Sequence, residues 1–267
     1  IAPTFFHYAK EIEDALDRHG IMYTFLNDRA KPGFFWKVVT RYTPRLNEAA
    51  VAKQLEHVCQ EQAFDALIVV KGECVSSQMF DVFEKSIQNS SHAFRFRDRF
   101  TQICTFDSGD AQKYQIKFLP LFVGMQFDPQ NLIEASVHDS KHYDLMFVGT
   151  AHSVRSRILN QVEKAATEQG LTFFDFRFVQ NKLIYLIRYL TNSDFRQTPK
   201  ALIHTQPIPM TEVKDVMDHS DVIVDVTHPK QTGLTGRVVE ALAMGRKVIT
   251  TNRLIVDYSV IDMRDVL

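Results

Sequence analysis

Short apolar runs alternate along the chain with segments in which apolar residues recur every three or four positions. The runs are typical of buried strands and the periodic segments of amphipathic helices. Their alternation over most of the chain favours an α/β fold. The predicted strands cover residues 21–26, 64–70, 102–106, 117–122, 144–148, 171–179 and 201–204. The predicted helices cover residues 8–18, 48–62, 77–87, 153–168, 182–190 and 211–219. Gly20 and Gly170 are the predicted stops of the first and fourth helix, and Thr211 is the predicted N-cap of the last.

The most informative stretch runs from Asp221 to Asn252. It predicts a buried strand, a polar loop, a short helix closed by a glycine, and a second buried strand. In a parallel sheet such a loop lies at the carboxyl edge, where open α/β folds bind ligands. The loop also opens a helix, so free backbone N–H groups and the helix dipole favour an anion there.

Polar side chains of this loop and helix are the candidate contacts of that anion. His228, Lys230 and Arg237 surround the loop, and Glu240 lies about one helical turn beyond Arg237 on the same face. Basic side chains beside a helix N-terminus are repelled unless an anion or a carboxylate answers them. A phosphate at the loop, with a carboxylate for sugar hydroxyls, would form a nucleotide-sugar site.

The alternative interpretation of residues 227–235 is an ordinary turn between a strand and a helix. Thr232 or Thr235 would then cap the helix, and Glu240 would pair with Arg237 on the helix surface.

A second candidate anion site follows the predicted strand at residues 144–148. A turn at residues 149–152 leads into a helix, and Gly149 allows backbone N–H groups to come close to a phosphate. The turn alone is a weak indication, because the fingerprint G-x-G-x-x-G is missing.

His7 is the candidate catalytic base. It follows what resembles the end of a first strand, and its ordinary pKa suits the deprotonation of an acceptor hydroxyl. A solvated loop residue is the competing interpretation. Asp107 and Asp110, in the turn after residues 102–106, are expected on the cleft side, where they could contact a ligand. Caps and solvated charges are the favoured interpretation.

Composition narrows the class of protein. A chain of 267 residues, 45% hydrophobic and 24% charged, suits two globular domains. The formal charge of −1 argues against a nucleic-acid partner. Cys59, Cys74 and Cys104 lack metal-ligand spacing and cannot all pair, which favours a reducing, cytoplasmic setting. Neither a membrane span nor a signal peptide is visible in the sequence.

Three segments resemble bacterial glycosyltransferases of the GT-B type, in particular those of capsule, exopolysaccharide and lipopolysaccharide synthesis. The most specific is His228-Pro-Lys-Gln-Thr-Gly-Leu-Thr-Gly-Arg-Val-Val-Glu240 together with Lys247-Val-Ile-Thr-Thr-Asn252. The other two are residues 1–12 and 143–155. Many GT-B enzymes carry two glutamates eight positions apart here; Glu240 matches the second, whereas Thr232 stands where the first would be.

The resemblance implies two Rossmann-like domains with parallel sheets that face a cleft. Residues 1–124 would bind the acceptor, a surface glycan or a lipid-linked precursor, and residues 125–267 the nucleotide-sugar donor. The enzyme would be a metal-independent glycosyltransferase without a cofactor, located in the cytoplasm and peripherally at the inner membrane face. Besides His7 as base, the expected donor contacts are Gly149, His152, Arg155, His228, Lys230, Gln231, Thr232, Gly233, Thr235, Arg237 and Glu240.

Two other functions fit the same pattern. A sugar-nucleotide epimerase of GT-B-like fold would use the same donor pocket with carboxylates near the sugar ring. A two-lobed solute-binding protein would bind a ligand without turning it over.

Overall fold

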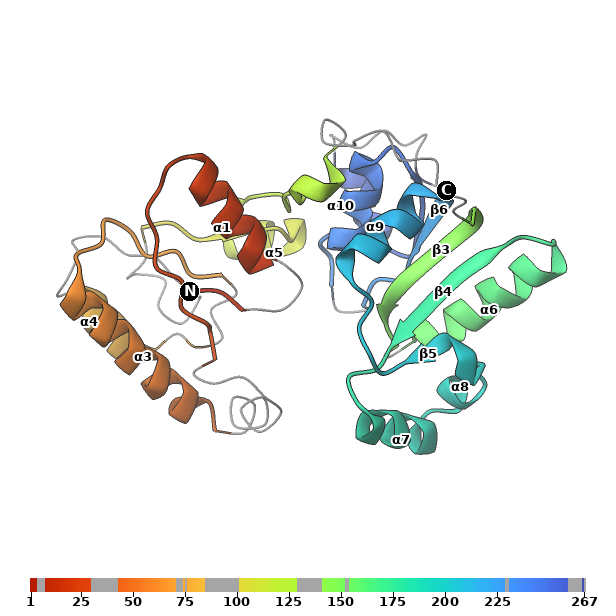
Figure 1. Ribbon diagram of the computed structural model, residues 1–267, viewed down its shortest axis with the longest axis horizontal. Helices are drawn as coiled ribbons and strands as arrows, with labels where there is room; N and C mark the ends of the chain where they lie inside the picture. Colours follow the sequence, from red (N-terminus) through yellow and green to blue (C-terminus); the bar gives the residue numbers. More distant parts are fainter. Residues whose placement is uncertain are drawn as a thin grey trace. The chain divides into compact units, whose positions relative to one another are not determined.

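The computed structural model describes residues 1–3, 8–29, 43–70, 74, 76–84, 101–128, 141–151, 154–228, 231–258 and 266. The chain divides into two compact units, Ile1–Thr105 and Phe106–Leu267 (Figure 1). Each unit is described by itself. The binding roles expected for the two halves of the chain stay predictions.

A five-stranded parallel sheet forms the centre of the second unit. Its strands lie in the order β5-β4-β3-β6-β7. In chain order this is third, second, first, fourth, fifth, which is the order of a doubly wound, Rossmann-like sheet. The predicted α/β class with a parallel sheet is therefore confirmed. The strands are β3 (Tyr143–Thr150), β4 (Phe173–Phe178), β5 (Ile203–His204), β6 (Ser220–Asp225) and β7 (Lys247–Thr250).

Helices cover both faces of this sheet (Figure 1). Neighbouring residues of a strand point to opposite sides, so an apolar strand presents hydrophobic side chains to both layers of helices. On one face, Leu145 and Phe147 pack with Leu159 of α6 (Arg155–Glu168). On the other face, Met146 packs in a cluster with residues of α9 (Met210–Asp218) and α10 (Gly236–Ala243). The sheet is thus buried on both sides, as its apolar strands predict.

The described part of the chain also contains shorter elements. β1 (Cys104–Thr105) and β2 (Lys117–Phe118) form a separate two-stranded parallel sheet. The others are α5 (Ser108–Tyr114), η2 (Met125–Phe127), α7 (Lys182–Thr191), α8 (Ser193–Arg196), η4 (Lys200–Leu202) and η5 (Arg253–Asp257).

The first unit contains three described helices, α1 (Tyr8–Arg18), α3 (Pro44–Glu61) and α4 (Ser77–Glu84). Its small core gathers Val51 and Leu55 of α3 around Met79 of α4. Cys74 is buried in the same core, and burial raises the pKa of its thiol to about 12.

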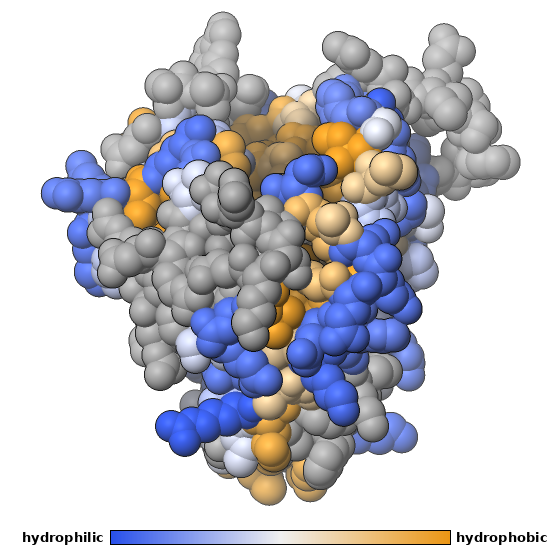
Figure 2. Space-filling model, turned by 90° about the vertical axis from the view of Figure 1, so that its left-hand side faces the viewer, coloured by the Kyte–Doolittle hydropathy of each residue, from blue (hydrophilic) through white to orange (hydrophobic). Residues whose placement is uncertain are grey.

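The strands predicted at residues 21–26 and 64–70 are not formed as strands. They form only a few backbone contacts with the start of the chain. Ala2 N–H donates to Leu26 O at 3.1 Å, Val70 N–H donates to Ile1 O at 2.8 Å, and the amino group of Ile1 donates to Ile68 O at 2.6 Å. Several apolar residues of these segments are exposed, with Met22 98% exposed, whereas Leu26 and Phe64 pack against the core of this unit. Figure 2 shows hydrophobic side chains reaching the surface among hydrophilic ones.

Two local predictions in the second unit are also wrong. β3 continues through Gly149 and Thr150, where a turn was predicted, because both residues pair with β4. Thr211 does not cap α9; the helix starts one residue earlier, and Pro209 is its N-cap. Proline fixes a backbone angle that suits the entry to a helix.

Candidate functional site

The carboxyl ends of β3 and β6 meet where the strand order reverses, which is where doubly wound sheets bind ligands. Arg155, the first residue of α6, joins these two strand ends. Its Nε donates to the carbonyl oxygen of Val226, and its Nη1 lies 3.2 Å from both the carbonyl and the hydroxyl oxygen of Thr150. Burial lowers the pKa of this guanidinium, and the nearby Asp225 carboxylate opposes that shift. Arg155, which the sequence predicted as a contact of the donor phosphate, therefore forms its hydrogen bonds with the ends of the protein's own strands.

Gly149 allows close packing at this point. A Cβ atom there would lie 2.8 Å from the Phe147 ring and 3.5 Å from Nη1 of Arg155. Any larger residue would have to displace that ring, so the glycine is explained by packing within the protein.

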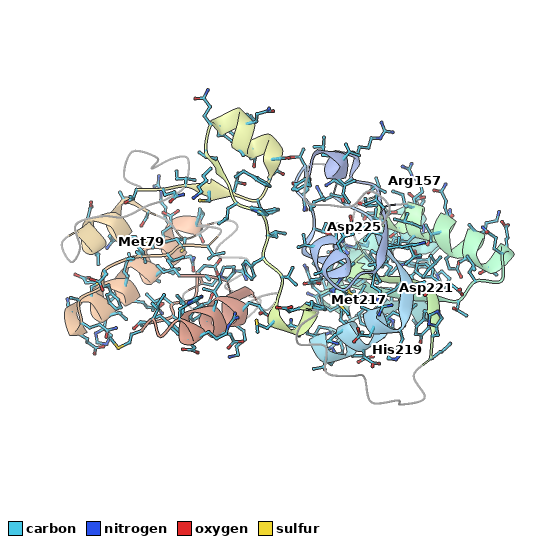
Figure 3. All side chains as sticks on the ribbon, turned by 90° about the horizontal axis from the view of Figure 1, so that it is seen from above. Met79, Arg157, Met217, His219, Asp221 and Asp225 are labelled. Carbon is cyan, nitrogen blue, oxygen red and sulfur yellow. The ribbon has the colours of Figure 1, made fainter. Side chains whose placement is uncertain are left out.

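Asp225, the last residue of β6, anchors the loop that leads to α10 (Figure 3). Its buried carboxylate accepts hydrogen bonds from three threonine hydroxyls: Thr227 at 2.7 Å, Thr235 at 2.9 Å and Thr250 at 2.8 Å. Thr235 is also the N-cap of α10, and its hydroxyl oxygen accepts from Val238 N–H at 3.3 Å. Both ends of the loop are thus fixed to one carboxylate.

The predicted anion position in this loop is occupied by Asp107. The backbone N–H groups of Thr232 and Gly233, called here the loop amides, donate to its Oδ2 at 3.0 and 2.6 Å. The Thr232 hydroxyl donates to Oδ1. Two adjacent N–H groups that converge on one carboxylate are a common anion-binding arrangement.

Asp107 is held equally firmly from its own side. It is the N-cap of α5, accepting from Asp110 N–H at 3.0 Å, which confirms the predicted cap. Burial would raise the pKa of its carboxyl, but hydrogen bonds from Thr232, Asp110 and Gly233 outweigh it, and the pKa lies below the ordinary value. The carboxylate therefore binds as an anion.

Gly233 and Gly109 allow this close approach. A Cβ atom on Gly233 would lie 3.0 Å from Cα of Asp107, and one on Gly109 would lie 2.8 Å from the Thr232 hydroxyl oxygen. Asn252 supports the loop from behind: its Nδ2 donates to the carbonyl oxygens of Thr232 and Gly233 at 3.1 and 3.2 Å.

Arg237 and Glu240 form an ion pair on α10, with Nη1 2.6 Å from Oε2. Both side chains are mostly buried, at 17% and 18% exposed. The Glu240 carboxylate thus neutralises the charge of Arg237 near the start of the helix, as the alternative interpretation of residues 227–235 expected. Nε of Arg237 is buried without a partner among the described residues, so the guanidinium retains an unused donor.

The remaining predicted contacts are placed as follows. Gln231 lies inside the loop, and its Nε2 donates to the Gly233 carbonyl oxygen at 3.0 Å. His228 begins the loop, and its carbonyl oxygen accepts from Gln231 N–H at 2.8 Å. His7, His152 and Lys230 lie outside the described residues.

Sequence reasoning did not identify how the loop is held. Asp225 and Asn252 lie within the motif, yet its pattern does not indicate that they hold the loop. Asp107 was expected on the cleft side, as a cap or a solvated charge, and its partner Thr232 lies 125 residues away in the chain. No local pattern signals such a contact.

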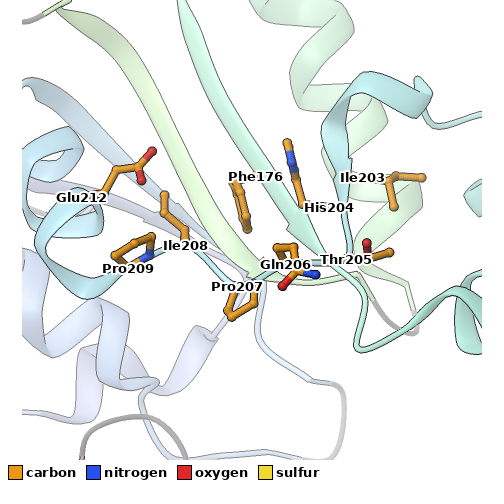
Figure 4. A pocket seen from close by; sticks show the side chains of 9 residues that line it. All are labelled: Phe176, Ile203, His204, Thr205, Gln206, Pro207, Ile208, Pro209 and Glu212. Atoms are coloured by element: carbon orange, nitrogen blue, oxygen red, sulfur yellow. The ribbon is translucent and has the colours of Figure 1, made fainter.

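A pocket of about 420 Å³ lies at the carboxyl end of β5 (Figure 4). Phe176, His204 and the segment 205–209 line it, and Glu212 in the first turn of α9 borders it. The rings of Phe176 and His204 stack with their centroids 4.1 Å apart. This pocket, which the sequence did not predict, lies at the same edge of the sheet as the loop amides.

Among the described residues, no three His, Cys, Asp or Glu side chains gather in a way that would hold a metal ion. No helix in that part of the chain combines the length and the apolar character needed to cross a membrane. In the comparisons with known proteins, no family model, curated protein or solved structure matches this chain.

Proposed function

We propose that the chain is a GT-B-type glycosyltransferase. It transfers a sugar from a nucleoside-diphosphate sugar to a surface glycan or lipid-linked acceptor. The donor binds to the unit Phe106–Leu267, and the acceptor binds to Ile1–Thr105. The sequence resemblance suggests this chemistry, and the Rossmann-like strand order of the second unit agrees with it.

The observation that carries the proposal is the carboxylate held by the loop amides. Thr232 and Gly233 present two N–H groups, and Thr232 adds a hydroxyl, to one negatively charged group. The loop lies just before α10, so the helix dipole adds to its affinity for anions. A phosphoryl group offers the same oxygen acceptors with more charge.

The donor diphosphate would replace the Asp107 carboxylate at the loop amides. Nε of Arg237, buried and without a partner among the described residues, would supply a further donor once the guanidinium turns to the phosphate. Glu240 would then accept from ribose hydroxyls. The pocket beside Phe176 and His204 offers aromatic and proline surfaces that suit a nucleobase.

Thermal-shift measurements with UDP, GDP, CMP and dTDP test the donor site, because a ligand that binds only the folded state raises Tm. We expect one of the nucleoside diphosphates to stabilise the wild type. Arg237→Ala should weaken its binding by about 1.5–3 kcal/mol, as expected for a lost charge-assisted hydrogen bond. Arg157→Ala, on an exposed position of α6, is the matched control.

Asp107→Asn tests the exchange of carboxylate for phosphate. It removes the competing charge but keeps a capping oxygen, so the affinity for the diphosphate should rise, whereas Asp110→Asn should leave it unchanged. Unchanged affinity in a folded Asp107→Asn variant would assign the loop amides a structural role only.

An activity assay separates the enzyme from its rivals. Under the proposal, the bound sugar nucleotide releases its diphosphate when an acceptor glycan is added. Conversion of the sugar in the absence of an acceptor would indicate an epimerase, and binding without turnover would indicate a binding protein.

A further inference from the structure

The helix α7 presents its apolar side to solvent. Leu183, Leu186, Ile187 and Leu190 follow the spacing i, i+3, i+4, i+7 and therefore share one face. They are 57%, 50%, 50% and 66% exposed. We call these four residues the α7 stripe. Figure 1 shows α7 outside the sheet, next to α8.

The inward side of α7 is already occupied by packing. Ile184 and Tyr185 pack onto the cluster of Ala151, Val179 and Phe195, and Tyr185 meets the Phe195 ring edge to face at 5.6 Å. An ordinary surface helix buries its one apolar stripe and exposes polar residues. α7 has apolar residues on both sides, so the α7 stripe lacks the polar character expected of a solvated face.

Basic residues outnumber acidic ones in the segment that carries the α7 stripe. Between residues 181 and 202 the chain carries Lys182, Arg188, Arg196 and Lys200 against the single acid Asp194. Arg188 lies on the inward side of α7 with Ile184 and Tyr185, and its Nη1 is buried. The exposed cations of this segment are therefore Lys182, Arg196 and Lys200. Tyr189 is 43% exposed beside the stripe, and an aromatic ring with a hydroxyl suits the boundary between lipid and water.

The last turn of α7 is fixed from outside the helix. Nη1 of Arg196 donates to the carbonyl oxygens of Tyr189 and Leu190, both at 3.1 Å. The N-terminus is capped by Asn181, which accepts from Ile184 N–H at 2.9 Å. The α7 stripe is therefore presented on a helix that is stable at both ends, without the need for a partner to order it.

We propose that α7 is a membrane-surface helix, which lies in the plane of an anionic lipid bilayer with the α7 stripe inserted among the acyl chains. An apolar face flanked by Lys and Arg is the pattern of such helices. The net positive charge of this segment complements lipid phosphates, and this favours an anionic bilayer over an apolar groove of a protein. The inference does not depend on the proposed function, since vesicle binding requires no sugar nucleotide.

Flotation with vesicles tests the proposal on the complete chain. We expect the wild type to float with vesicles of phosphatidylcholine and phosphatidylglycerol and to bind phosphatidylcholine alone far more weakly. Leu186→Ser combined with Leu190→Ser should lower the partition constant by about tenfold or more for each leucine. Lys182→Gln combined with Lys200→Gln should lower it about fivefold for each charge.

Leu46→Ser combined with Val256→Ser is the matched control, because these apolar side chains are 60% and 62% exposed elsewhere on the surface. Circular dichroism and the urea midpoint verify that each variant is folded. The proposal is overturned if the wild type does not float with anionic vesicles, or if the stripe variant floats as well as the control. It is also overturned if ultracentrifugation finds a dimer that the stripe variant dissociates, since the occupant would then be a second copy.

Discussion

The charge of Asp107 makes its contact with the loop amides dependent on pH. Hydrogen bonds lower the pKa of this carboxyl in the folded protein, so its stabilisation is complete above the unfolded pKa of about 3.9 and is lost as the pH falls through the folded value. We expect Asp107→Asn to reduce the free energy of unfolding by about 1 kcal/mol at neutral pH. The difference between variant and wild type should shrink below about pH 4. Urea titrations at neutral and at acidic pH measure the free energy of unfolding of both proteins. A difference between them that does not change with pH would contradict the role of an ionised Asp107 carboxylate.

A second residue-scale prediction concerns the buried pair of Asp175 and Arg177 on β4. Nε and Nη2 of Arg177 donate to both carboxylate oxygens, at 2.6 to 3.0 Å, and Nη1 donates to Asn160 and to Thr198. Both charged side chains are almost completely buried, and burial raises the pKa of the Asp175 carboxyl. Arg177→Met leaves the Asp175 carboxylate without its partner and should lower the free energy of unfolding by about 3–5 kcal/mol.

The double variant Asp175→Leu with Arg177→Met provides the control for that estimate. It removes both charges, so chemical denaturation should show a smaller loss than for Arg177→Met alone. A loss equal to the sum of the two single variants would show that the two side chains do not act as a pair.

At the scale of elements, helices were easier to predict from the sequence than strands. α1, α6 and α7 lie within two residues of their predicted bounds, because helix periodicity and stop signals are local. The residues at 21–26 and 64–70 have the composition of strands but form none, since a strand needs neighbours that its own sequence does not specify.

The same distinction applies to the candidate site. Thr235 was one of the two caps, with Thr232, that the alternative interpretation of this loop offered from a local signal, and it is the N-cap of α10. The hydrogen bonds from Thr232 and Gly233 to Asp107 depend on where the fold positions α5. The sequence around these residues does not encode that position. The sequence therefore predicted an anion position but not the group that occupies it.

Thr235 should matter for α10 as a whole, because its hydroxyl group caps the helix and also donates to Asp225. Thr235→Ala removes both contacts and leaves one oxygen of a buried carboxylate with fewer donors, so we expect a loss of about 1–2 kcal/mol. Thr235→Ser keeps the hydroxyl and should recover most of it. Urea midpoints of the two variants decide the matter: equal losses would mean that the methyl group, not the hydroxyl, is responsible.

At the scale of the whole molecule, each unit has hydrophobic clusters made of its own residues. The clusters around Met146, Leu145 and Ala151 belong to Phe106–Leu267, and the cluster around Val51 belongs to Ile1–Thr105. A domain with its own core is expected to fold alone. The five-stranded sheet and its helices should therefore form in a fragment of residues 106–267, which includes Asp107 and the loop amides.

We expect this fragment to unfold in one cooperative urea transition and to retain the nucleoside diphosphate binding proposed for the complete chain. The physical reason is that every described residue of the proposed donor site lies between residues 106 and 267. Circular dichroism follows the transition, and calorimetry compares diphosphate affinity in fragment and complete chain. A broad, non-cooperative transition would show that the core needs the first unit. A cooperative fragment that has lost the affinity of the complete chain would instead place part of the donor site in residues 1–105.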